Sequence, residues 1–139
     1  MATTGTDLKA RGGETEKMTI NLGVVDLGQI DLLVQEGFYS NRSDLIRTAI
    51  RNQLRVHGDA IQQTVARRTL SVGLQDISRL ELERLRAAGQ TLRIQALGLV
   101  RIAADVTPEL ALATIESISV LGALQANDAL RKALADRIT

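Results

Sequence analysis

Residues 17–22 alternate strictly between polar and apolar side chains, and this short segment constrains the fold more than any other part of the chain. A period of two predicts a half-buried β-strand with one apolar and one polar face. The apolar positions are Met18, Ile20 and Leu22, and the polar positions are Lys17, Thr19 and Asn21. No second strand follows, because residues 24–37 change to helical spacing. A lone strand leaves backbone groups unpaired along its edges, so we predict that another chain supplies the partner strand.

A second helix is predicted after a short turn at residues 37–40. Gly37 suits the left-handed position beyond the end of the first helix. Ser40 is the predicted N-cap of the second helix, and Asp44 favours its first turn. Free backbone N–H groups and a positive dipole end make such a helix start attractive to anions. Side chains suited to holding a phosphate gather there, namely Ser40, Asn41, Arg42 and Ser43.

Further basic residues flank this predicted anion seat. Arg47, Arg51 and Arg55 recur every four residues, which aligns them on one face of the second helix. They serve either phosphate contact or solubility, and the pattern leaves both open. Lys9 and Arg11 lie in the Gly- and Thr-containing segment 1–15, which we interpret as a mobile arm that either touches phosphates or is simply solvated.

The composition limits the architecture. A chain of 139 residues suffices for one ordinary domain, or for two small ones that depend on each other or on a partner for a core. Hydrophobic residues make up 45% of the chain and aromatic residues 1%, so the core must consist of Leu, Ile, Val and Ala. The formal net charge of +1 gives no overall attraction to a polyanion. Any argument for nucleic acid must therefore be local.

Residues that commonly carry out chemistry are absent or isolated. There is no cysteine, which excludes disulfides and thiolate zinc sites, and the single histidine, His57, is predicted to cap the end of the second helix. No P-loop, dinucleotide-binding glycine pattern or Ser, His and Asp set is present. We expect no enzyme, no cofactor and no metal site. No apolar run approaches the length of a membrane helix, so we expect a cytoplasmic protein without a membrane partner.

From about residue 61 onward, strand-like and helix-like segments alternate. Strands are predicted to begin near residues 69, 91 and 117, at a loose spacing of 22 to 26 residues. Each is followed by a helix with its own start signal, and these signals are at Ser78, Thr107 and Asn127. The second and third units are the most alike, with residues 96–98 and 120–122 reading ALG and VLG. Internal repetition and chance similarity among Leu- and Ala-rich segments both remain open.

Residues 16–56 resemble the ribbon-helix-helix family of DNA-binding proteins, of the CopG and Arc type. The most specific part is the run Gly37, Ser40, Asn41, Arg42, Ser43, Asp44, Ile46, Arg47 and Ala49. One departure is Gly23, which stands where family members commonly have a proline after the strand. The resemblance implies a homodimer in which two copies of the strand form an antiparallel ribbon. This ribbon would enter the major groove of double-stranded DNA.

The resemblance also assigns roles to residues. Lys17, Thr19 and Asn21 would read base edges, and their donors and acceptors suit that task. Residues 40–43 would hold DNA phosphates on either side of the ribbon, with Lys9, Arg11 and Arg47 as possible additional phosphate contacts. The phosphate contacts would fix the orientation of the protein on the DNA, and the strand would provide the preference for particular bases.

We therefore expect an α+β protein with three parts: a flexible arm at 1–15, a ribbon-helix-helix DNA-binding domain at 16–60, and a C-terminal domain of strand-helix repeats at 61–139. Its expected function is transcriptional repression, and its expected location is the cytoplasm, in association with the nucleoid. The repeats have open ends, which favours assembly of dimers into tetramers or larger species. Three alternatives for the C-terminal domain stay open: sensing of an organic ligand, neutralisation of a toxin partner by an antitoxin, and a structural nucleoid or partition role.

Overall fold

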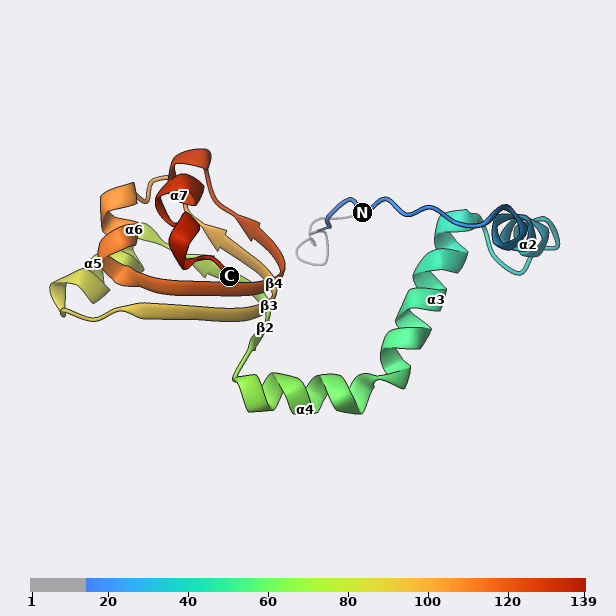
Figure 1. The fold of residues 1–139 in the computed structure, drawn as a ribbon, viewed down its shortest axis with the longest axis horizontal. Helices are drawn as coiled ribbons and strands as arrows, with labels where there is room; N and C mark the ends of the chain where they lie inside the picture. The colour runs from blue at the N-terminus through green and yellow to red at the C-terminus, as the bar shows by residue number, and fades with distance from the viewer. Residues whose placement is uncertain (1–14) are drawn as a thin grey trace. The chain divides into compact units, whose positions relative to one another are not determined.

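The structure is a computed structural model that describes residues 15–139. Helices and strands are both abundant, as expected for a mixed α and β protein. The described chain divides into a unit of residues 17–64 and a unit that comprises residues 15–16 and 65–139. Each unit is considered separately, and both can be followed in Figure 1.

The first unit consists of an extended segment and helices. Residues 15–23 have no regular secondary structure. Helix α2 covers Val24–Gln35, and α3 covers Arg42–Val56. Gly37 has a φ of +86°, the left-handed conformation expected of the residue that ends the first helix. Its backbone N–H donates to the carbonyl oxygen of Val34 at 3.1 Å, which closes the end of α2.

A further helix, α4 at Gly58–Arg68, was not predicted. His57 is the C-cap of α3, as expected, but the chain re-enters a helix at the next residue. Gly58 does not have the left-handed conformation that commonly ends a helix. The glycines with positive φ in the described chain are Gly37, Gly73, Gly89, Gly98 and Gly122. The segment VHGD therefore marks a break between two helices rather than the end of helical structure.

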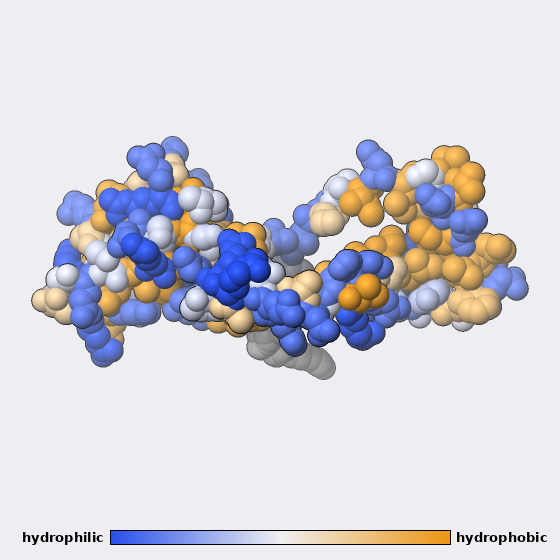
Figure 2. Space-filling view, turned by 60° about the horizontal axis from the view of Figure 1, so that its bottom comes forward, coloured by the Kyte–Doolittle hydropathy of each residue, from blue (hydrophilic) through white to orange (hydrophobic). Residues whose placement is uncertain are grey.

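The first unit has no buried interior of its own. None of the residues of α2, α3 or α4 is buried. Hydrophobic side chains gather on the surface instead, as seen on the right of Figure 2. The most exposed ones are Met18, Val24, Val25, Phe38 and Val56. Apolar surface of this extent is costly in water, so this unit lacks the core that an independent domain needs.

The second unit is built from three strand-helix pairs. The strands are β2 at Ser71–Ile77, β3 at Leu92–Ile102 and β4 at Ile115–Gln125. The helices are α5 at Arg79–Ala87, α6 at Pro108–Thr114 and α7 at Asp128–Ala133, followed by the 3₁₀ turn η1 at Ala135–Arg137. The strands form a parallel sheet in the order β2-β3-β4. Side chains of Ser78, Thr107 and Asn127 cap the three helices, as predicted.

Helices α5, α6 and α7 cover one face of this sheet (Figure 1), and the core lies between the two layers. Every fully buried hydrophobic residue of the described chain belongs to this second unit. The core is aliphatic, as the composition predicted. Its largest members include Ile77, Leu82, Ile94, Ile115, Ile118, Leu130 and Leu134.

Three glycines stand in register across the sheet. Gly73 is paired with Gly98, and Gly98 with Gly122. All three have a φ between +112° and +138°, a region that disfavours side chains. A Cβ atom on Gly98 would lie 2.3 Å from the carbonyl oxygen of Gly73, and one on Gly122 would lie 2.1 Å from that of Gly98. The common bend and close approach explain why ALG and VLG recur 24 residues apart.

Candidate nucleic-acid interface

The six residues predicted to form the ribbon lie at the surface. Residues 17–22 are exposed and make no strand within the single chain. Met18 is 77% exposed, Ile20 52% and Leu22 41%. The expected half-burial of the apolar side chains is therefore absent from the isolated chain. A β-strand needs a neighbour for its backbone hydrogen bonds, and the described residues supply none to this segment.

The N-cap of α3 is Asn41 and not Ser40, which corrects the prediction by one residue. The Asn41 side-chain oxygen accepts a hydrogen bond from the backbone N–H of Asp44 at 2.8 Å. The Asp44 carboxylate reaches back and accepts from the backbone N–H of Ser40 at 3.0 Å. Two donors are thus satisfied reciprocally. If Ser40 were the N-cap, Ser43 would occupy the position whose side chain accepts a hydrogen bond from the N-cap backbone N–H. The serine side chain is too short to make that bond.

The start of α3 keeps free donors for an anion. In the part of the chain that the structure describes, no acceptor takes the backbone N–H of Arg42 or Ser43. Both side chains are exposed, as are those of Ser40 and Asn41. The predicted phosphate-holding residues are therefore together at one helix start. Because Asp44 also lies there, its negative charge partly opposes an incoming phosphate.

Arg42 is bound to a residue that the sequence analysis did not single out. Its guanidinium donates to the Asp31 carboxylate through Nε at 2.7 Å and through a terminal nitrogen at 2.8 Å. These hydrogen bonds lower the pKa of Asp31 and raise that of Arg42. Asp31 is on α2, so the ion pair joins α2 to α3. The five N–H donors of an arginine leave three for other acceptors.

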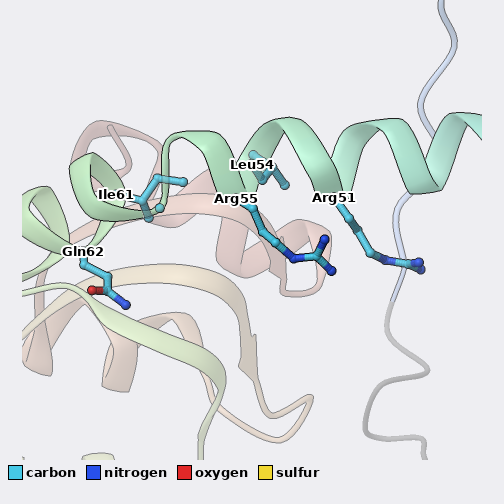
Figure 3. A pocket seen from close by; sticks show the side chains of 6 residues that line it. Arg51, Leu54, Arg55, Ile61 and Gln62 are labelled. Carbon is cyan, nitrogen blue, oxygen red and sulfur yellow. The ribbon is translucent and has the colours of Figure 1, made fainter.

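The basic stripe follows α3 away from its start. Arg47, Arg51 and Arg55 are all exposed. Arg51 and Arg55 extend side by side at an open hollow where α3 meets α4 (Figure 3), and Leu54, Ile61 and Gln62 also line it. Arg55 donates to the Asn52 side chain at 3.0 Å. Lys9 and Arg11 lie outside the described residues.

The Ribbon-Helix-Helix transcriptional regulator family matches residues 13–131. The chain belongs to this family. The match extends well beyond the resemblance recognised at residues 16–56, because it includes β2, β3, β4 and the helices between them. Among curated proteins and solved structures, no match was found. The described helices include none with the length and apolar content needed to cross a membrane.

Two features of the site were not accessible from local patterns. Asp31 looks like any exposed helical carboxylate in the sequence, and only the turn at residues 36–41 brings it to Arg42. Helix α4 was missed because Gly58 was interpreted as a stop signal. The acidic Asp59 in its first turn and the basic Arg67 and Arg68 in its last turn were the available signal.

Proposed function

We propose that this transcriptional regulator is a repressor that binds operator DNA as a homodimer, with residues 17–22 of both chains paired as an antiparallel ribbon. Lys17, Thr19 and Asn21 of each chain face the base edges. This follows the major-groove mode of strand readers. Lys17 donates to guanine acceptors, and Asn21 pairs with an adenine edge.

The observation that carries the proposal is the missing core of residues 17–64. Three helices without a buried residue, next to an exposed alternating segment, indicate that the hydrophobic surface is covered by a second copy. In a ribbon dimer, Met18, Ile20 and Leu22 turn toward the helices of both chains. The partner strand also satisfies their backbone groups.

The phosphate contacts come from the start of α3. The free N–H groups of Arg42 and Ser43, with the side chains of Ser40, Asn41 and Ser43, form an anion seat on each side of the ribbon. The unused donors of Arg42 and the exposed Arg47 add positive charge. These contacts position the dimer but carry no base preference.

We further propose that residues 65–139 join dimers into larger assemblies. This unit has its own core, so it is suited to rigid contacts between copies rather than to folding on a partner. Assembly would let several dimers bind neighbouring half-sites cooperatively. Light scattering on the full chain tests this, with more than two 15.0 kDa chains per particle as the expected result.

The DNA-binding proposal is tested first by footprinting on the protein's own upstream region. The variant Ile20→Glu places a charge in the ribbon interior, and we expect it to lose dimerisation through residues 17–64 and specific binding together. Leu121→Glu is the matched control, because Leu121 is 47% exposed and lies on the other unit. Wild-type footprints with Ile20→Glu would contradict the ribbon dimer.

A further inference from the structure

The two edges of the β2-β3-β4 sheet differ in how they are covered. The edge formed by β4 is partly covered by its own chain, because the carbonyl oxygen of Ile118 accepts the backbone N–H of Thr139 at 2.9 Å and Ile118 bridges to Ile138. Further along, the guanidinium of Arg131 donates to the carbonyl oxygen of Leu124. In the described chain β2 pairs with β3 alone. Among residues 15–139, β2 is therefore the edge strand without a second pairing partner, whereas β4 has one bridge.

Strand β2 carries little of the usual protection of an edge. Natural sheets guard their edges with proline, lysine or inward charges. The sequence of β2 is SVGLQDI, in which the single charge is Asp76 near its end. Val72 is 68% exposed and Leu74 47% exposed, and both lie on the sheet face opposite the core. An open, apolar edge of this kind is suited to pairing with another strand.

Gly73 adds evidence that another backbone approaches this edge. Gly98 and Gly122 leave room for the neighbouring strand, since a Cβ on either would collide with the preceding glycine. A Cβ on Gly73 would meet nothing within 4 Å, although Gly73 has the same kind of φ, +112°. The side that faces a neighbouring strand at Gly98 and at Gly122 thus faces no described residue at Gly73. A further strand could approach Gly73 as closely as Gly73 approaches Gly98.

We propose that β2 pairs antiparallel with β2 of a second copy of this chain, about a two-fold axis at Gly73. A second copy fits because, among the described residues, β2 is the edge strand that its own chain does not cover, and every copy presents this same edge. When both copies contribute the same edge, the interface has two-fold symmetry and the assembly closes as a pair. Two different open edges would instead pair head to tail and form filaments. The proposal deepens the assembly role proposed for residues 65–139 and rests on it.

The register follows from the bend of the strands. Within the chain, the bent glycines stand opposite each other across all three strands, so the same match places Gly73 opposite Gly73 of the partner subunit. Val72 then faces Leu74 of the partner subunit on the outer side of the sheet. Ser71 faces Gln75 of the partner subunit on the core side.

That register also accounts for a polar atom without a partner. The side-chain oxygen Oε1 of Gln75 is buried and accepts no hydrogen bond among the described residues. Such an atom is destabilising unless a donor is supplied. In the proposed pair, the hydroxyl of Ser71 from the partner subunit lies opposite Gln75 and can donate to it.

Disulfide cross-linking in the full chain tests the pairing. The protein has no cysteine, so an introduced thiol is the only one present. Directly opposite residues of an antiparallel pair have Cα atoms about 4.5–5.5 Å apart, within the roughly 4.4–6.8 Å that a disulfide spans. Chains carrying Val72→Cys and chains carrying Leu74→Cys are co-expressed with different tags and oxidised. We expect a covalent mixed dimer.

The separate samples are the first control, because each introduced thiol is then about 7–8 Å from its own copy, too far for ready bonding. Leu121→Cys is the second control, since Leu121 lies on the same outer face but on β4. Equal cross-linking in the mixture and in the separate samples would overturn the register. Efficient cross-linking by Leu121→Cys would overturn edge pairing.

The result can be separated from the rest of the function. A mixed cross-link without operator binding supports β2 pairing and contradicts the DNA-binding proposal alone. Absence of the mixed cross-link, in a protein that still binds its operator and scatters as more than two chains, overturns β2 pairing and leaves assembly to another surface. Circular dichroism confirms that each variant is folded.

Discussion

Arg42 at the start of α3 holds Asp31 of α2 through two parallel hydrogen bonds of 2.7 and 2.8 Å. This bidentate geometry fixes the guanidinium beside the free N–H groups of the helix start. Arg42 therefore has two roles in the proposed function: it ties the two helices together, and it offers its remaining donors to a phosphate. Variants of the two partners separate these roles.

Arg42→Ala should weaken binding to all duplexes by a similar factor and reduce the dependence of affinity on salt, because a phosphate contact carries no sequence information. Asp31→Asn removes the competing carboxylate but keeps the arginine, so we expect affinity to be maintained or increased. Titrations of specific and random duplexes at several salt concentrations measure the affinity of each variant and its dependence on salt. Equal losses in the two variants would show that Arg42 acts only through the packing of α2 on α3.

The ion pair also predicts a dependence of stability on pH. Arg42 lowers the pKa of Asp31 in the folded protein, so the stabilisation is present above the pKa of the unfolded carboxyl and is lost as the pH falls through the folded pKa. Thermal unfolding of wild type and Asp31→Asn should therefore differ at neutral pH and converge in acid. A difference that is constant over the whole range would mean that the carboxylate charge is not responsible.

Asn21→Ala should relax base preference by about 1–3 kcal/mol at one position of each half-site, the usual size of a lost base contact. Binding to a library of operator variants measures this. Gln95→Ala is the control, because Gln95 is an exposed amide on β3. Unchanged preference at every position with Asn21→Ala would contradict the assignment of the ribbon face.

Asn41→Ala should lower the free energy of unfolding by about 1 kcal/mol, the typical contribution of an N-cap side chain. Ser40→Ala should have a much smaller effect, because the Ser40 contact to Asp44 uses the backbone N–H and not the hydroxyl. Urea denaturation at a fixed protein concentration compares them. If Ser40→Ala were the more destabilising variant, the cap would be at Ser40 after all.

Gly98→Ala should be strongly destabilising. The strained φ costs about 1–3 kcal/mol, and the contact of 2.3 Å with the Gly73 carbonyl oxygen adds an overpacking cost of similar size. Gly28→Ala, in the interior of α2 with nothing near its Cβ position, should instead stabilise by about 0.5–1 kcal/mol. Denaturant midpoints of both variants test the opposite signs. A neutral Gly98→Ala would rule out close packing of the strands at this glycine.

The sequence by itself determined the features that depend on neighbours along the chain. Alternation at residues 17–22 predicted a strand that needs a partner, and caps at Ser78, Thr107 and Asn127 located three helices. Such signals are readable because a cap bonds within three residues and an apolar face repeats within one or two turns. The similarity of residues 96–98 and 120–122 suggested a repeat but left chance similarity open.

Only the tertiary structure decided which distant groups meet. It showed that Asp31 binds Arg42 and that three glycines align across the sheet. Among the described residues, β4 is bridged by Ile138 whereas β2 pairs with β3 alone. It also showed that residues 17–64 bury none of their hydrophobic side chains. These relations depend on register and on contacts through space, which a local pattern of residues does not encode.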